Sequence, residues 1–104
     1  MKVIFDIDEL ITQLTDVSSV ITLIEDPLVL DYLAHEYTKY YVENNNNEAD
    51  FEIVDCVARN GCTHAVTLDF LAQKIKEGVF PNWFKRYILC HENTCEITKK
   101  MLED

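Results

Sequence analysis

Residues 26–42 read DPLVLDYLAHEYTKYYV, and this stretch contains the strongest helix signal in the chain. Asp26 can accept hydrogen bonds from the free backbone amides of a first helical turn. Pro27 suits the first helical position because it has no amide hydrogen to lose there. The apolar residues that follow recur every three or four positions, at Leu30, Leu33, Tyr37 and Tyr40 or Tyr41. This pattern predicts an amphipathic helix from Pro27 to about Val42.

The segment after this helix allows two interpretations. Asn44 to Asn47 is a run of four asparagines with no apolar residue, which predicts a loop. Asn60-Gly61 is a common hairpin turn, so residues 54–67 could form two strands. A helix over roughly 48–59 fits better, because it gathers the apolar residues on one side and Asn47 can cap it. We therefore predict this helix, with a hairpin turning at Asn60-Gly61 as the alternative.

Two further helices are expected before residue 26. Apolar residues at helical spacing predict a helix near residues 6–15, although Val3 to Phe5 could instead form a short strand. Asp16 is a candidate cap for a second short helix. The apolar residues of that helix are Val17, Val20, Ile21 and Ile24.

The C-terminal half predicts three more short helices. The first would be capped by Thr63 or Thr67, carry Leu68, Leu71 and Ile75, and end at Gly78. Pro81 opens the next, which includes Trp83, Phe84, Tyr87 and Ile88. Asn93 or Thr94 would cap the last, with Ile97 and Met101 facing inward and Lys99 and Lys100 facing outward.

Composition supports the same fold class. The chain has 104 residues, 48% of them hydrophobic, with only two glycines and two prolines. This length suits one domain with a modest core, and so few turn residues favour helices over a β-sandwich or barrel. We predict a single all-α domain over residues 1–104, a compact bundle of five to seven short helices. We detect no internal repeat in the sequence.

No targeting segment is recognised. Asp6 stands where a signal peptide would carry apolar residues, and no apolar stretch is long enough to span a membrane. We expect a soluble cytoplasmic protein without membrane contact, in which the four cysteines are reduced thiols.

Charge is divided unevenly along the chain. Residues 1–58 contain thirteen Asp and Glu but only Lys2 and Lys39 as bases, whereas residues 59–104 contain six acids and seven bases. The formal net charge is −10. Self-repulsion of this kind does not stabilise a fold, so the acidic half serves either solubility or attraction to a basic partner.

Metal and catalytic sites are not favoured by the cysteine and histidine positions. The candidate ligands are Cys56, Cys62, His64, Cys90, His91 and Cys95. Their spacing does not match the paired cysteines of a zinc knuckle. Cys95 could gain nucleophilicity at a helix start, but Glu92 and Glu96 would oppose the thiolate. We expect no metal, no cofactor and no enzymatic activity.

One basic and aromatic cluster requires a separate interpretation. Lys85-Arg86 lies among Trp83, Phe84 and Tyr87, a combination that can bind single-stranded nucleic acid. Two bases are few, and a net charge of −10 repels phosphate. We therefore expect no direct nucleic-acid binding, and we interpret Trp83 as a partly exposed interface anchor.

The predicted function is a small non-enzymatic binding protein, an inhibitor or adaptor that occupies the basic surface of a nucleic-acid-binding protein. Carboxylates displayed on helices can imitate the phosphates of DNA, and small acidic viral inhibitors of restriction, CRISPR or transcription proteins resemble this chain in composition. A phage anti-defence protein, such as an anti-CRISPR, or a transcription regulator would fit. The predicted partner-binding residues are Asp31, Glu36, Glu43, Glu48, Glu52, Asp55, Tyr37, Tyr40 and Trp83. The alternative is a structural module that self-associates through its less charged C-terminal half.

Overall fold

The computed structural model describes residues 17–103, which form six α-helices and one 3-10 turn without any strand. The elements are α2 (Val17–Thr22), α3 (Pro27–Glu43), α4 (Glu48–Arg59), α5 (Ala65–Lys76), η1 (Asn82–Phe84), α6 (Lys85–Cys90) and α7 (Glu96–Glu103). The all-α prediction is confirmed, and the alternative hairpin at Asn60-Gly61 does not form. The helix predicted near residues 6–15, the possible strand at residues 3–5 and the Asp16 cap lie outside the described residues.

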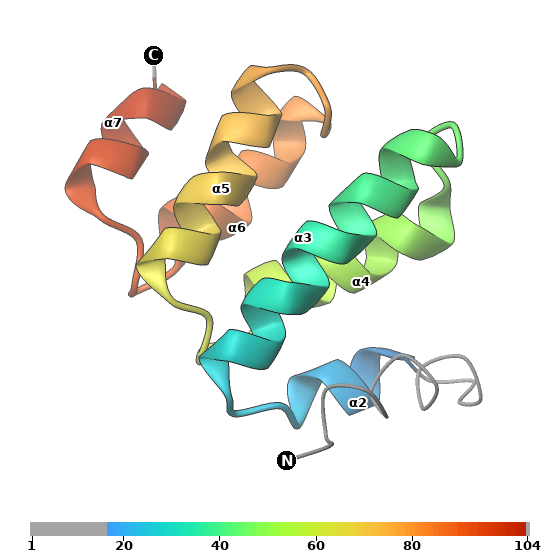
Figure 1. Cartoon of the computed structure of the whole chain (residues 1–104). Helices are drawn as coiled ribbons and strands as arrows, with labels where there is room; N and C mark the ends of the chain where they lie inside the picture. Colours follow the sequence, from blue (N-terminus) through green and yellow to red (C-terminus); the bar gives the residue numbers. More distant parts are fainter. Residues whose placement is uncertain (1–16, 104) are drawn as a thin grey trace.

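The start of α3 and the turn between α3 and α4 both agree with the sequence prediction. Asp26 caps α3 by accepting a hydrogen bond from the Leu28 amide at 2.9 Å. Asn47 caps α4 through bonds from the amides of residues 49 and 50. Asn45 and Asn46 have φ angles of 57° and 62°, in the left-handed region that asparagine tolerates better than most residues. This short loop turns the chain back, so that α3 and α4 pack against each other (Figure 1).

The predicted caps of α5 and α7 are wrong. His64 occupies the N-cap position of α5, and Thr67 lies inside that helix. Thr63 is not a cap because its hydroxyl donates back to the Val57 carbonyl at 2.6 Å. Thr94 likewise donates to the Ile88 carbonyl at 2.6 Å, and α7 begins only at Glu96, beyond the predicted Asn93. Both threonine hydroxyls therefore satisfy a carbonyl near the end of the preceding helix.

These two turns are copies of one motif, which corrects our finding of no internal repeat. The bond from Thr94 to Ile88 lies 31 residues after the bond from Thr63 to Val57. A second pair of hydrogen bonds in these turns is separated by the same 31 residues. The Cys62 amide donates to the Asn60 side chain at 2.7 Å, and the Asn93 amide donates to the His91 ring at 3.1 Å. The sequence LDYLA at residues 30–34 returns as LDFLA at residues 68–72. The described residues thus form three helix–turn–helix units in succession.

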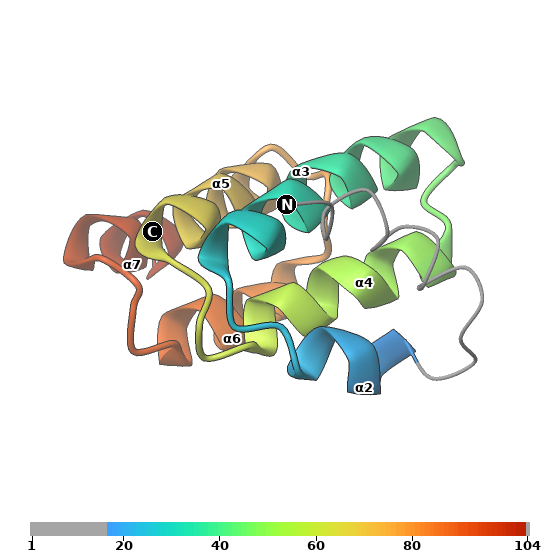
Figure 2. The ribbon, with the colours of Figure 1, turned by 60° about the horizontal axis from the view of Figure 1, so that its bottom comes forward.

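We call these helix pairs unit 1 (α2 and α3), unit 2 (α4 and α5) and unit 3 (α6 and α7). Figure 2 shows them stacked in two layers, with α3, α5 and α7 in one and α2, α4 and α6 in the other. The two layers pack on each other mainly through α3 and α4, and neighbouring helices within each layer are also in contact, so the fold is a bundle of short helices. The apolar residues at the centre of the core are fully buried: Leu30, Leu33, Val54, Val57, Leu68, Leu71, Phe84 and Ile88.

Polar side chains join each unit to the next. The Asn60 amide group donates to the carbonyls of Ile21 and Ile24 in unit 1, each at 2.9 Å. The Nε2 of buried His91 donates to the Asn60 carbonyl at 2.8 Å, which links unit 3 to unit 2. Buried polar groups are costly unless they are paired, so these bonds hold the units in one register.

Ile97 departs from its predicted orientation. It is 83% exposed, although its spacing with Met101 indicated a core position. Met101 is partly buried against the core, as predicted. The buried positions of α7 are instead taken by Thr98 and Leu102, and the Thr98 hydroxyl donates a hydrogen bond to Asp69 of unit 2.

Candidate protein-binding surface

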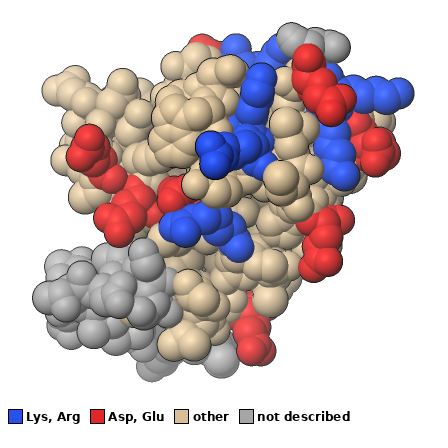
Figure 3. Space-filling view, turned by 180° about the vertical axis from the view of Figure 1, so that it is seen from behind, with Lys and Arg blue, Asp and Glu red and all other residues tan. Residues whose placement is uncertain are grey.

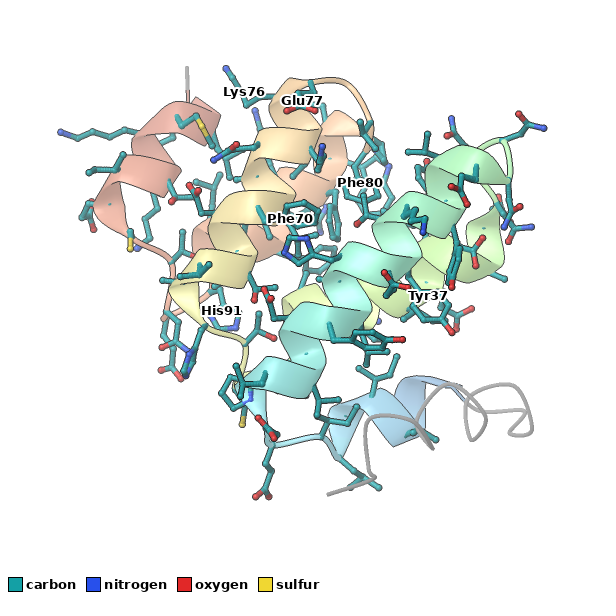
Figure 4. All side chains as sticks on the ribbon, in the orientation of Figure 1. Tyr37, Phe70, Lys76, Glu77, Phe80 and His91 are labelled. Carbon is teal, nitrogen blue, oxygen red and sulfur yellow. The ribbon has the colours of Figure 1, made fainter. Side chains whose placement is uncertain are left out.

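The structure distributes the predicted partner-binding residues over separate parts of the molecule. Asp31 lies on α3, and its Oδ1 accepts a hydrogen bond from Thr67 of α5 at 2.5 Å. His35 Nε2 lies 3.5 Å from the same oxygen, and the His35 ring stacks on Phe70 at 3.8 Å. Figure 4 shows Phe70 pointing from α5 toward α3. Asp31 therefore connects units 1 and 2, a role that the sequence pattern did not indicate.

Glu36, Tyr37 and Tyr40 form a second group on α3. The Tyr40 hydroxyl donates to Glu36 Oε1 at 3.5 Å, and the two tyrosine rings meet edge to face at 5.3 Å. Figure 4 shows Tyr37 on the side of α3 that faces away from α5. All three side chains are partly buried. Their predicted contact with a partner stays a prediction.

The remaining acidic residues gather around α4. Glu48, Glu52 and Asp55 are four and three residues apart, so they lie along one side of this helix. Glu43 ends α3 on the other side of the asparagine turn. Figure 3 shows acidic side chains toward both sides of the back face of the molecule, with basic side chains across the middle between them. The acidic row along α4 ends at Arg59, which pairs with Asp55 at 2.9 Å.

Asp55 differs from the other carboxylates of this row because it is buried more deeply. Desolvation raises the pKa of Asp55 above its ordinary value of 3.8, and the neighbouring charge of Glu52 adds to the rise. Arg59 opposes both effects through its charge and its hydrogen bond. Within the described residues, Asp55 Oδ1 is buried and has no hydrogen-bond partner. Asp55 is thus held by the fold, whereas Glu43, Glu48 and Glu52 are exposed.

Trp83 lies beside the start of α4, as part of an aromatic cluster. It is 52% exposed, and its ring meets Phe51 of α4 edge to face at 5.7 Å. Tyr87 continues this cluster at 6.3 Å from Trp83, and Arg59 and Arg86 each lie 5.8 Å from the Tyr87 ring. An exposed tryptophan that is fixed by packed aromatic neighbours suits an interface anchor.

We define the α4 surface as Glu48, Glu52, Asp55, Arg59 and Trp83. It includes four of the nine residues predicted from the sequence. Arg59 was not among the predicted contact residues, although its position four residues after Asp55 was a visible signal for an ion pair on one helix face.

Arg59 lines three hollows on the surface, near the C-terminal ends of α2, α4 and α6. Their volumes are about 300, 200 and 270 Å³. Cys90 and His91 line two of them. Both ring nitrogens of His91 are occupied, since Nε2 donates to Asn60 and Nδ1 accepts from the Asn93 amide. His91 is therefore not placed to act as a base for a cysteine.

None of the four cysteines forms a disulfide, and Cys56 is buried whereas the other three are exposed. Among residues 17–103, no group of three or more histidine, cysteine or acidic side chains is arranged to hold a metal ion. The described part of the chain also has no helix with the length and apolar character needed to cross a membrane.

Comparison with protein families, curated proteins and solved structures finds no match to this chain.

Proposed function

We propose that this protein is a non-enzymatic binding protein whose α4 surface, together with Glu43, occupies a basic surface on a partner protein. The observation that carries the proposal is the exposed acidic group formed by Glu43, Glu48 and Glu52. Within the described residues, the four ion pairs involve other carboxylates: Asp31, Asp55, Glu77 and Glu96. Glu43, Glu48 and Glu52 therefore present charges that are available to an outside partner.

The arrangement also supports a particular order of events in binding. Exposed carboxylates attract a basic surface over a distance, which speeds association at low salt. Trp83 then supplies a rigid apolar contact beside them, of the type that contributes most to affinity. Arg59 and Arg86 would meet acidic residues at the rim of the partner's surface, because they lie next to Tyr87 on the same face.

The partner class that best fits this chemistry is a nucleic-acid-binding protein in the cytoplasm, whose Lys- and Arg-lined groove ordinarily holds phosphates. The protein would act there as an inhibitor or adaptor, as a phage anti-defence protein such as an anti-CRISPR does, or as a transcription regulator. DNA mimicry is the form of inhibition in which the carboxylates take the places of the phosphates. Self-association is the second candidate function, supported by the exposed apolar residues Trp83 and Ile97 in the C-terminal half.

The test begins with capture of the partner from the native host at low and high salt. Association rates are then measured for Glu43→Lys, Glu48→Lys and Glu52→Lys. Each should slow association about tenfold at low salt and flatten its salt dependence, because steering by charge is screened by ions. Glu103→Lys makes the same charge change on exposed α7 and serves as the matched control. Asp31 is a poor test position, because its substitution also removes the acceptor of Thr67.

Competition decides whether the partner's nucleic-acid site is the one occupied. DNA or RNA that binds the partner should displace this protein. Simultaneous binding of both would exclude mimicry and leave an adaptor role. Equal effects of the α4 variants and the Glu103 control would overturn the proposed surface, and tight binding of this protein to DNA would reject the electrostatic argument. A concentration-dependent dimer in sedimentation equilibrium would favour self-association instead.

A further inference from the structure

The three units expose a large apolar residue at the same position. Leu28, Val66 and Ile97 are each the second residue of the second helix in their unit, and their exposed fractions are 74%, 76% and 83%. The residue that follows each of them is buried, with exposed fractions of 3%, 1% and 3%. Single exposed apolar residues are common on proteins, but the same exposed position in three successive units is a regular feature.

These residues form a row across the stack. The helices α3, α5 and α7 lie side by side in one layer and begin at the same edge of the molecule (Figure 1). We call Leu28, Val66 and Ile97 the turn-edge row, because the turns within the units, residues 23–26, 60–64 and 91–95, lie along this edge. Adjacent packed helices are about 8–10 Å apart, so the row presents three apolar side chains at about that spacing.

The first and third turns beside the row carry exposed acidic residues, whereas the middle turn, residues 60–64, has none. Glu25 and Asp26 are exposed in unit 1, and Glu92 is exposed in unit 3, where the nearby Glu96 already pairs with Lys99. The three turns contain no lysine or arginine within the stated ranges. The nearest bases in sequence are already paired, Arg59 with Asp55 and Lys99 with Glu96. A ligand along this edge would therefore meet apolar contacts with negative charge near the two ends of the row.

The spacing between the apolar residues of the row favours one backbone conformation for such a ligand. A polyproline II helix has three residues per turn and rises about 3.1 Å per residue, so every third side chain lies on one face at intervals of about 9 Å. This interval matches the distance between neighbouring helices of the stack. A β-strand would place every third residue on alternating faces, so it could not bring three consecutive such residues to the row.

We propose that the turn-edge row binds a polyproline II segment of a partner protein, with an apolar residue at every third position and lysine or arginine between them. The apolar residues cover Leu28, Val66 and Ile97, and the bases meet the acidic first and third turns. This surface is distinct from the α4 surface, and the proposal does not depend on the function proposed above.

The test uses a fluorescently labelled nine-residue peptide, three repeats of Leu-Pro-Arg, and measures its binding to the full chain by anisotropy. A peptide of the same composition with its leucines adjacent, and one with glutamate in place of arginine, serve as controls and should bind at least tenfold more weakly. Leu28→Ser, Val66→Ser and Ile97→Ser should each weaken binding of the first peptide about tenfold or more. Val42→Ser, also exposed but in the last turn of α3, should leave binding unchanged.

All four substituted side chains are more than half exposed, so the variants should fold, which circular dichroism verifies. The proposal is overturned if the first peptide does not bind, if either control peptide binds equally well, or if the serine variants bind like the unsubstituted chain. It is also overturned if sedimentation equilibrium shows a dimer that the three serine substitutions abolish. The row would then be a contact between two copies of this chain.

Discussion

Replacing Thr67 with valine tests whether the units are held together by the polar bonds between their second helices. Thr67 is 1% exposed, and its hydroxyl donates to Asp31 at 2.5 Å. Valine has nearly the same shape but no hydrogen to donate. A hydrogen bond to a charged group contributes about 1.5–3 kcal/mol to stability. The Asp31 side chain is 38% exposed and can regain water, so we expect the lower end, a loss of about 1.5 kcal/mol.

Urea unfolding measures this loss. With an m-value of about 1–3 kcal/mol/M, the midpoint should fall by about 0.5–1.5 M. Thr38→Val is the matched control in α3, because Thr38 is also buried but its hydroxyl has no partner within the described residues. That variant should be as stable as the unsubstituted chain or more so. A double-mutant cycle of Thr67→Val with Asp31→Ala should give a coupling of about 1.5 kcal/mol. A coupling below about 0.3 kcal/mol would refute the reasoning.

Three further predictions concern pH, backbone conformation and metal. The pKa of Asp55 is raised in the folded state, so protonation of Asp55 should stabilise the fold as the pH falls through that raised pKa. The full gain in stability should be present below pH 3.8, the ordinary pKa of this group. Asp55→Asn should remove this gain in urea titrations across that window; an unchanged slope would contradict it. Gly78 has a φ of 85°, so Gly78→Ala should cost about 1 kcal/mol in thermal melts, whereas Gly61→Ala should be neutral, since a Cβ there meets open space. A chelator should leave the melting temperature unchanged, and stoichiometric zinc in the purified protein would overturn that expectation.

The helices that could be predicted are those whose signals are local. Asp26 and Pro27 start α3, and Asn47 starts α4, because capping requires only a side chain and the amides of the next turn. The choice between helix and hairpin at residues 48–59 depended on which pattern gathered the apolar residues on one side. These features involve residues a few positions apart, which a single sequence displays directly.

The repeat was missed because its defining contacts are not local. Thr63 and Thr94 resemble helix caps in sequence, and only the fold shows that they bond backward to the preceding helix. Unit 3 also departs from the pattern, with Lys100 at the position that Asp31 and Asp69 hold in the first two units. The similarity of residues 30–34 to residues 68–72 was the available signal.

The prediction of the binding site was also limited by contacts between residues that are distant in sequence. The predicted helix over residues 48–59 is confirmed and carries Glu48, Glu52 and Asp55, but periodicity could not show that Asp55 is paired and partly buried. For Asp31, no local pattern shows that a threonine 36 residues away donates to it.

The stacked arrangement has a consequence for how the chain reaches its fold. Each unit packs chiefly on the one before it, so the contacts that form the core join segments that are close in sequence. Short loops of this kind lose little entropy on closing, and helical proteins rich in such contacts fold in about microseconds to milliseconds. During synthesis, α3 and α4 can pair while the last hairpin is still being made. Unit 3 then docks on an edge that is already in place.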